Sequence, residues 1–300
     1  MIYPESKLKI WLLAIRPKTL PAATAPVIVG SAVAIMEDRF LFLPAFAAML
    51  GALLLQIGAN LANDVFDFHR GADSESRLGP TRVTQAGLLT SKQVLMGMWV
   101  VFGLAACVGL YLFSVAGWAV LVIGMLSILA AIAYTGGPLP LGYYGLGDLT
   151  VFIFFGPIAV CGTYYVQAGA VSPTSIWASI PMGLLTVAIL VVNNLRDIKS
   201  DRLVGKKTLA VRLGEQGARW EYALCLLCSY LIPLVMGLVG VSSFWVLLTW
   251  LSFPVALKLI RMIVYEKGSA LNKALAGTGQ LELIYSLLFS VGLVATGLMT

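Results

Sequence analysis

The feature that most constrains this chain is a series of long apolar stretches that recurs from near the amino terminus to the carboxyl terminus. Each stretch holds about 20 residues, the length that an α-helix needs to cross the hydrocarbon core of a bilayer. Nine candidates occur, at residues 19–36, 41–63, 94–113, 117–135, 147–168, 174–194, 221–240, 243–264 and 280–299. Hydrophobic residues make up 59% of the 300 residues and charged residues only 11%, whereas soluble domains carry about 25% charged residues. The sequence therefore predicts an all-α, polytopic membrane protein with nine transmembrane helices in one bundle.

The positions of the basic residues predict how these nine helices are oriented. With nine spans, the amino terminus and the loops after spans 2, 4, 6 and 8 lie on one side of the membrane. Of the 20 Lys and Arg residues, 19 fall on that side, if the membrane-flanking Lys258 and Arg261 are counted, and only Arg39 falls on the other. Because basic loops are retained in the cytoplasm, we expect a cytoplasmic amino terminus and an inner-membrane location. Such loops also explain the net charge of +6, so nucleic acid is not an expected partner.

No Pro/Ser-rich or charged linker interrupts the apolar pattern, and we expect residues 1–300 to form a single transmembrane domain. A weak internal similarity divides this domain into two related halves, about 1–140 and 141–300. The similarity consists of two polar segments, the first acidic stretch at residues 60–67 and the second acidic stretch at residues 193–201. They end the second and the sixth span. Four spans separate them, so both are expected to emerge on the same, cytoplasmic side.

Each acidic stretch places oxygen-bearing side chains on one face of a helix, provided that the helix continues beyond the apolar span. The first face comprises Asn60, Asn63, Asp64 and Asp67, and the second comprises Asn193, Asp197 and Asp201. An acid near the hydrocarbon costs about 2.5–3.5 kcal/mol, and neighbouring carboxylates repel one another unless cations neutralise them. Asp and Asn oxygens suit the hard cation Mg2+ better than zinc or copper. The two stretches therefore predict a magnesium site.

Basic residues surround both acidic stretches. The neighbouring bases are Arg70, Arg77, Arg82, Arg196, Lys199, Arg202, Lys206 and Lys207. Acids that hold a metal, next to bases that can bind phosphate oxygens, indicate a diphosphate site. Alternatively, these segments are ordinary solvated loops of mixed charge. That alternative does not explain why two similar stripes occur at corresponding helix ends.

The segment at residues 134–147 is uncharged although it lies on the basic side of the membrane. Its glycines permit close backbone approach, and we expect it to line the pocket, with Asp148 at the mouth of the fifth span. A plain Gly/Pro turn between helices is the alternative. The four cysteines all fall inside apolar stretches and are interpreted as packing residues.

Several motifs between residues 16 and 214 give the chain a resemblance to a known family. They are Arg16-Pro-Lys-Thr-Leu-Pro21, the first acidic stretch with Gly71-Ala-Asp73 and Arg77-Leu-Gly-Pro80, Tyr134-Thr-Gly-Gly-Pro138 with Gly145-Leu-Gly-Asp148, Phe154-Phe-Gly-Pro157, and the second acidic stretch with Thr208-Leu-Ala-Val-Arg-Leu-Gly214. In these motifs the chain resembles the UbiA superfamily of intramembrane aromatic prenyltransferases, which have nine transmembrane helices and two Asp-rich motifs. Within it, the chain resembles the branch that prenylates 1,4-dihydroxy-2-naphthoate in menaquinone or phylloquinone synthesis.

The resemblance implies transfer of a prenyl group from a prenyl diphosphate to 1,4-dihydroxy-2-naphthoate, with decarboxylation and with Mg2+, two ions, as cofactor. The implied metal ligands are Asn63, Asp67, Asp197 and Asp201. The candidate catalytic residues are Asp64, Asp73, Lys206, Arg77 and Arg196. The candidate substrate-binding residues are Lys207, Arg82, Tyr134, Asp148 and Asn194. The third acid of the family's first motif falls two places late, at Asp73, so a direct metal role for it stays open.

Two other functions fit parts of the pattern. A sister enzyme of the same family would use another aromatic acceptor, such as 4-hydroxybenzoate, homogentisate or a chlorophyllide. A cation transporter would place its acids near mid-span in discontinuous helices, whereas here they cluster at the ends of spans. The expected partners are a prenyl diphosphate, the aromatic acceptor and the lipid bilayer, with no obligate protein partner. The last three spans carry few polar groups and are expected to complete the wall around the prenyl tail.

Overall fold

The computed structural model describes residues 6–72 and 78–299, and throughout this part of the chain the regular structure is helical, without a strand. Two of the predicted catalytic residues, Asp73 and Arg77, lie outside the described residues. The helices are α1 (Lys7–Ile15), η1 (Pro17–Thr19), α2 (Leu20–Met36), α3 (Phe42–His69), α4 (Ser91–Ala116), α5 (Trp118–Ala133), η2 (Leu141–Tyr143), α6 (Gly147–Ile153), η3 (Phe154–Ile158), α7 (Ala159–Ala168), α8 (Pro173–Leu203), α9 (Leu209–Leu238), η4 (Phe244–Ser252), α10 (Phe253–Tyr265), η5 (Gly268–Ala270) and α11 (Leu271–Gly297).

Eight helical segments of the described chain are long and apolar enough to cross a membrane. They are Lys7–Met36, Phe42–His69, Ser91–Ala116, Gly147–Ala168, Pro173–Leu203, Leu209–Leu238, Phe244–Tyr265 and Gly268–Gly297. The remaining predicted span corresponds to α5, an apolar helix of 16 residues. At 1.5 Å per residue it is about 24 Å long, which is shorter than the roughly 30 Å hydrocarbon core. The chain is an integral membrane protein, and its spans differ in length more than the sequence predicted.

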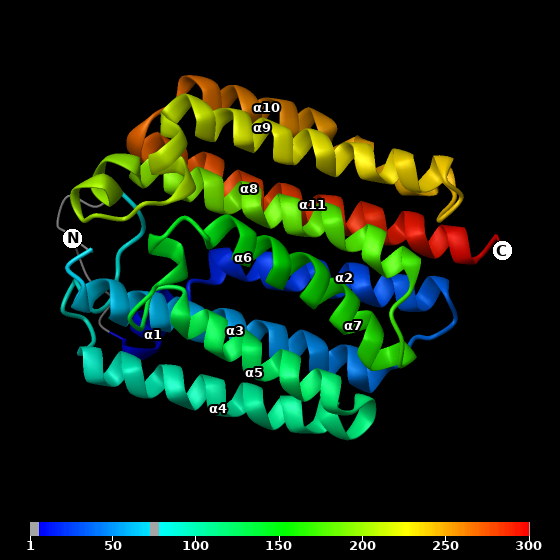
Figure 1. Ribbon diagram of the computed structural model, residues 1–300, viewed down its shortest axis with the longest axis horizontal. Coiled ribbons are helices and arrows are strands. Elements are labelled where there is room, and N and C mark those ends of the chain that lie inside the picture. The colour runs from blue at the N-terminus through cyan, green and yellow to red at the C-terminus, as the bar shows by residue number, and fades with distance from the viewer. Residues whose placement is uncertain (1–5, 73–77, 300) are drawn as a thin grey trace.

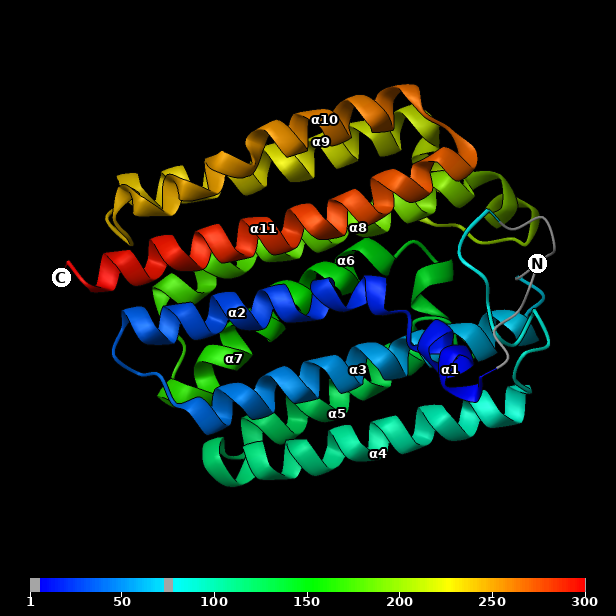
Figure 2. The ribbon, with the colours of Figure 1, turned by 180° about the vertical axis from the view of Figure 1, so that it is seen from behind.

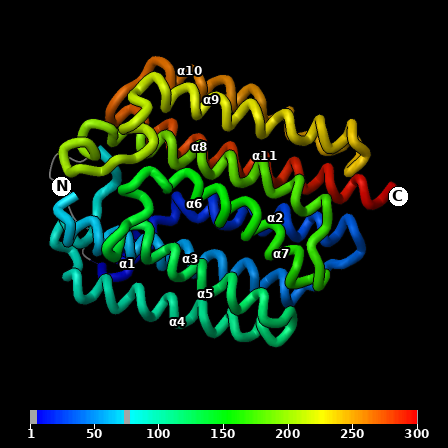
Figure 3. Tube along the Cα trace, viewed as in Figure 1, coloured from blue at the N-terminus to red at the C-terminus, as the bar shows by residue number. Residues whose placement is uncertain are grey.

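The long helices lie side by side in layers and share two common ends (Figure 1). In both ribbon views, α9 and α10 form one outer layer and α4 lies at the opposite edge, beside α3 and α5 (Figures 1 and 2). The connections α3–α4, α5–α6, α8–α9 and α10–α11 gather at one end together with α1, while α11 ends at the other, as the Cα trace also shows (Figure 3). The ends of α3 and α8, which carry the two acidic stretches, are therefore at the same end of the bundle.

Local sequence signals explain where several helices begin and bend. Thr90 and Ser172 form capping boxes before α4 and α8, in which each side chain accepts a hydrogen bond from a backbone N–H of the first turn. The predicted fifth span is one helix with a π-helical turn, η3, that contains Pro157. Proline lacks the N–H that a regular helix needs, so the wider turn accommodates it.

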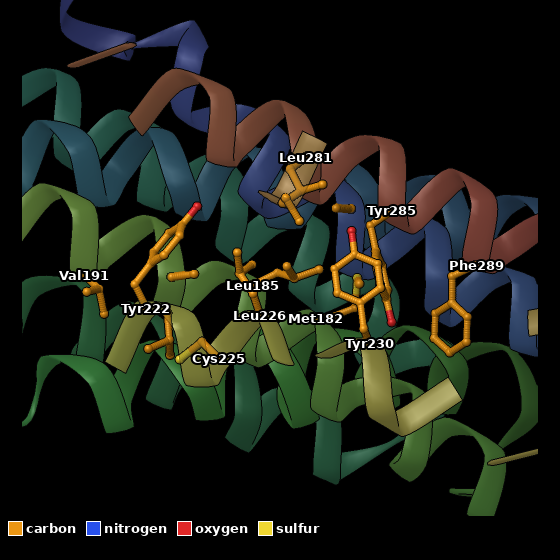
Figure 4. Close-up of a cluster of buried hydrophobic side chains, with 14 of the residues drawn as sticks. Met182, Leu185, Val191, Tyr222, Cys225, Leu226, Tyr230, Leu281, Tyr285 and Phe289 are labelled. Atoms are coloured by element: carbon orange, nitrogen blue, oxygen red, sulfur yellow. The ribbon is translucent and has the colours of Figure 1, made fainter. Parts of the chain in front are cut away.

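The apolar core lies mainly between α8, α9 and α11, and large side chains fill it. Figure 4 shows Tyr222, Leu226, Tyr230, Tyr285 and Phe289 in this cluster, together with aliphatic residues of α8. The rings of Tyr230 and Tyr285 meet edge to face with centroids 5.4 Å apart. Both hydroxyls have partners inside the protein: Tyr285 donates to the Ser229 carbonyl at 2.6 Å, and Tyr230 shares a hydrogen bond of 2.6 Å with the Ser252 hydroxyl. This side of the bundle is therefore a packed scaffold.

Candidate active site

A cavity of about 1320 Å³ occupies the other side of the bundle. Its polar end is lined by Asn63, Asp67, Asn193, Asn194, Asp197, Asp201 and Lys206. Farther into the membrane, small and aliphatic residues of α3, α4, α5 and α7 line it, including Ala48, Gly51, Gly109, Gly124 and Gly162. Along α3 the lining runs from Asp67 to Ala48, a distance of about 28 Å at 1.5 Å per residue. The cavity thus combines an acidic mouth with an apolar interior that is nearly as deep as a bilayer core.

The acid at the end of the first stretch, Asp67, is buried and heavily hydrogen-bonded. The helix α3 continues through it to His69, as the spacing predicted. Its carboxylate accepts from Arg82 Nη2 at 2.8 Å and from the Tyr143 hydroxyl at 2.8 Å. The ammonium of Lys206 lies 3.4 Å from Oδ1 of the same carboxylate. Asp67 is therefore fixed in position and faces the cavity among cations.

The other acid of the first stretch, Asp64, is buried but is not part of the cavity lining. Its carboxylate accepts from the backbone N–H groups of Val83 and Thr84, at 3.1 and 3.0 Å. Asn63, which precedes Asp64 in the chain, lines the cavity and accepts a hydrogen bond from the Thr135 hydroxyl at 3.0 Å. In the first stretch, Asn63 and Asp67 therefore face the cavity, whereas Asp64 binds the backbone of the segment that follows α3.

The second stretch is organised around Arg196, whose side chain is completely buried. Its Nε donates to Asp197 Oδ1 at 2.8 Å, and its Nη2 contacts the second oxygen of the same carboxylate. The same guanidinium donates to Asn193 Oδ1 and to Asn272 Oδ1, both at 2.8 Å. Asp197 and Asn193 line the cavity, whereas Arg196 lies behind them. The guanidinium therefore orients two cavity-lining oxygen groups.

Lys206 connects the two stretches across the cavity mouth. Its ammonium lies 3.4 Å from Asp67 and 3.9 Å from Asp201, and it also lies over the ring of Tyr143, 4.5 Å from the centroid. One carboxylate belongs to the first stretch and the other to the second. The two helix ends therefore converge closely enough for a single cation to interact with both.

The family model described as the UbiA prenyltransferase family matches residues 23–295 of this chain. The chain belongs to the UbiA prenyltransferase family. It is 42% identical over 296 residues to the 1,4-dihydroxy-2-naphthoate octaprenyltransferase of Escherichia coli (strain K12), with 96% of each chain covered. It is 37% identical over 299 residues to the protein of the same name from Haemophilus influenzae, with 97% of each covered. The protein is thus a membrane-bound prenyltransferase.

A solved structure shares the fold of this UbiA family member. It is a UbiA homolog from Archaeoglobus fulgidus bound to GPP and Mg2+, with a TM-score of 0.67, 14% sequence identity, and coverage of 95% of this chain and 99% of that chain. The likeness holds over nearly the whole length of both chains, so the helices described above have the family arrangement.

The structure brings most of the predicted site residues of this family member to the cavity. Besides the acidic stretches, the predicted substrate-binding residues Arg82, Tyr134 and Asn194 are part of the lining. The fold thus places these three predicted substrate-binding side chains at the cavity wall.

Two other predicted substrate-binding residues lie elsewhere. Lys207 has an exposed side chain and is not part of the lining, although its backbone N–H donates to the Tyr143 carbonyl at 2.8 Å. Asp148 is buried behind the cavity wall, and neither of its carboxylate oxygens has a hydrogen-bond partner among the described residues. Asp148 lies in the first turn of α6, which begins at Gly147, but its side chain is not part of the cavity lining.

The expectation that the last three spans complete the cavity wall is wrong, because the lining includes no residue of 221–240, 243–264 or 280–299. Among the described residues, α11 contributes Asn272, Leu275, Ala276 and Gly279, whereas α9, η4 and α10 contribute none. The latter elements pack in the outer layer against α8 and α11. Sequence reasoning also missed Thr135, Tyr143 and Asn272. Thr135 and Tyr143 belong to the segment 134–147, which the sequence predicts to line the pocket, whereas Asn272 is a lone Asn ahead of the predicted span 280–299 and carried no signal.

Proposed function

We propose that this protein transfers the prenyl group of a prenyl diphosphate to 1,4-dihydroxy-2-naphthoate, with loss of CO2, in menaquinone or phylloquinone synthesis. The acceptor is that of the two similar bacterial proteins, both of which are 1,4-dihydroxy-2-naphthoate octaprenyltransferases. The observation that carries the proposal is the convergence of two acidic stretches at the polar end of a deep apolar cavity. Such a cavity can hold a charged diphosphate at its mouth and an isoprenoid chain within it. A single domain of two related halves, residues 1–300, is part of the same proposal.

The proposed cofactor is Mg2+, as two ions, held by Asn63, Asp67, Asp197 and Asp201. Among the described residues, no group of three or more His, Cys, Asp or Glu side chains could hold a metal ion alone, so the proposed sites combine carboxylate and amide oxygens and would be completed by substrate phosphates. The donor set fits, because it consists of oxygens only, and because the Lys206 ammonium already lies between carboxylates of both stretches. When bound, the ions supply Lewis-acid stabilisation of the departing diphosphate.

The chain's own residues perform the remaining tasks. Lys206 and Arg82 line the mouth and can bind phosphate oxygens, while Tyr143 keeps the Asp67 carboxylate in place. Behind the mouth, the apolar lining excludes water from the allylic carbon. The carbon–oxygen bond to diphosphate breaks, and its electron pair leaves with the diphosphate. The naphthoate ring carbon that carries the carboxylate forms the new carbon–carbon bond, and loss of that carboxylate as CO2 returns the bonding pair to the ring and restores its aromaticity. No strong base is required for that sequence.

An assay with two labels tests the acceptor. Purified protein in detergent or vesicles is given Mg2+, radiolabelled prenyl diphosphate, and either 1,4-dihydroxy-2-naphthoate labelled in its carboxyl group or 4-hydroxybenzoate. We expect labelled prenylnaphthoquinol and release of labelled CO2 in equal amounts. Transfer to 4-hydroxybenzoate instead would refute the proposed acceptor and favour a sister enzyme, while retained carboxyl label in the product would refute decarboxylation.

We also propose that the protein lies in the inner membrane and that its cavity mouth opens on the cytoplasmic side. The support is the basic charge of the loops at that end of the bundle, since only Arg39 among the 20 basic residues was assigned to the other side. Single cysteines are introduced at Val204, in the α8–α9 connection, and at Ala170, in the α7–α8 connection, after the four native cysteines are replaced. A membrane-impermeant maleimide applied to intact cells should label Ala170→Cys and spare Val204→Cys. The opposite result would invert the orientation.

A further inference from the structure

Asn272, in the first turn of α11, lies at the cavity mouth and uses both ends of its side-chain amide. Its Oδ1 accepts a hydrogen bond from Arg196 Nη1 at 2.8 Å. Its Nδ2 donates to the backbone carbonyl of Leu78, also at 2.8 Å. The amide is therefore a two-way link between α8 and the segment that follows the first acidic stretch.

On the α8 side, the hydrogen bond to the Asn272 amide oxygen determines the orientation of the Arg196 guanidinium. The guanidinium is a planar fork whose donors have fixed directions, and here they reach Asp197, Asn193 and Asn272 simultaneously. With the Asn272 oxygen holding one edge of the fork, the opposite edge presents the Asp197 carboxylate at the cavity wall. Loss of the oxygen would allow the guanidinium, and Asp197 with it, to rotate.

On its other side, the link holds the backbone at Leu78. A few residues later, the same segment supplies the partners of the first acidic stretch. Arg82 pairs with Asp67, and the N–H groups of Val83 and Thr84 bind Asp64. The segment is thus attached at both ends, to α3 near residue 83 and to α11 at residue 78.

We propose that Asn272 is a positioning residue that holds the two acidic stretches at the separation needed to bind Mg2+ together with a pyrophosphoryl group. This inference rests on the proposed function. An amide is suited to the role because it accepts from a cation and donates to a carbonyl at once. Aspartate at this position would keep the first bond and lose the second.

Two variants and a matched control test the proposal in the full-length protein. Asn272→Ala removes both bonds, Asn272→Asp removes only the bond to Leu78, and Lys273→Ala alters the neighbouring exposed side chain of the same turn. Two quantities are measured for each: the Mg2+ concentration for half-maximal prenyl transfer, and the rise in melting temperature caused by inorganic pyrophosphate with Mg2+. The second quantity requires no turnover.

For Asn272→Ala we expect the half-maximal Mg2+ concentration to rise about 10–100-fold, the usual effect of removing a group that orients metal ligands, with a smaller pyrophosphate stabilisation. For Asn272→Asp, the half-maximal Mg2+ concentration and the pyrophosphate stabilisation should both lie between the values for Asn272→Ala and wild type. For Lys273→Ala, both values should equal those of wild type. If Asn272→Ala does not fold, Asn272→Asp decides the question alone by the same two measurements.

Two results would overturn the proposal. In the first, the asparagine variants keep the wild-type Mg2+ requirement and pyrophosphate stabilisation, so that Asn272 positions nothing. In the second, only the KM for prenyl diphosphate rises while the Mg2+ requirement is unchanged, which marks Asn272 as a substrate contact. Failure of the proposed function looks different, because then wild type itself shows neither transfer nor stabilisation by pyrophosphate.

Discussion

The two acidic stretches have similar sequences but are held in place by different means. In the second stretch, the cation that pairs with Asp197 is its chain neighbour Arg196, so this helix end carries its own counter-charge. In the first stretch, the partners of Asp67 come from elsewhere: Arg82 from the segment after α3, and Lys206 from the α8–α9 connection. The first stretch therefore takes its counter-charges from other segments, whereas Asp197 takes its counter-charge from the adjacent residue. The second stretch still depends on α11, because Asn272 accepts a hydrogen bond from Arg196. Two stretches of similar sequence therefore need not lose the same stability or activity when corresponding residues are replaced.

The largest expected effect is common to both stretches. Asp67→Ala or Asp197→Ala should each reduce Mg2+-dependent prenyl transfer by about 10²–10³-fold or more, because each removes an anionic group that faces the cavity mouth. Transfer rates at saturating substrates measure the loss. Thermal unfolding of the same samples shows whether each variant still folds. If both variants kept wild-type activity, the assignment of these acids as metal ligands would be wrong.

A second experiment tests the dependence of the first stretch on its neighbouring segment. Asp64→Ala leaves the buried N–H groups of Val83 and Thr84 without their acceptor, and should lower the free energy of unfolding by about 1–3 kcal/mol. Asn194→Ala, at the corresponding position of the second stretch, should lower it by less, since Asn194 faces the cavity. Thermal or denaturant unfolding in detergent measures both variants. Equal losses of stability would contradict the difference proposed between the stretches.

The smallest expected effect concerns a single bond to Asp67. Tyr143→Phe removes the hydroxyl that donates to this carboxylate but keeps the ring beneath Lys206. Because Arg82 still fixes the carboxylate, activity should fall by about tenfold or less, at the lower limit for a hydrogen bond to a charged group. Tyr144→Phe, which alters the neighbouring and more exposed tyrosine, should have no effect. A loss of a hundredfold or more in Tyr143→Phe would mean that its hydroxyl contacts substrate directly.

The helices and the general location of the site could be predicted because they follow from local properties. Apolar length predicted where each span would lie, and the spacing of three and four residues predicted that α3 would continue through Asp67 and α8 through Asp201. The structure has both continuations. The motifs also resembled those of the UbiA superfamily, and the family match shows that this resemblance is correct. The resemblance allowed prenyl transfer to be predicted from the sequence.

Other features of the site depended on tertiary structure. The sequence placed Asp64 and Asp67 on one helix face, yet only Asp67 borders the cavity, while Asp64 binds the backbone after α3. It also placed Asp148 at the pocket and α9 and α10 around it, but these elements lie behind or outside the wall. Asn272, distant in the chain from both acidic stretches, carried no sequence signal at all.

What the sequence by itself determined was the membrane setting, the succession of helices and the oxygen-rich ends of two of them. What only the tertiary structure decided was which neighbour each polar group meets and which helices enclose the cavity. The physical reason is that periodicity reports the direction of side chains around a single helix axis. The rotation of that helix against its neighbours is set by the packing of many apolar side chains together, and this packing has no local pattern in the chain.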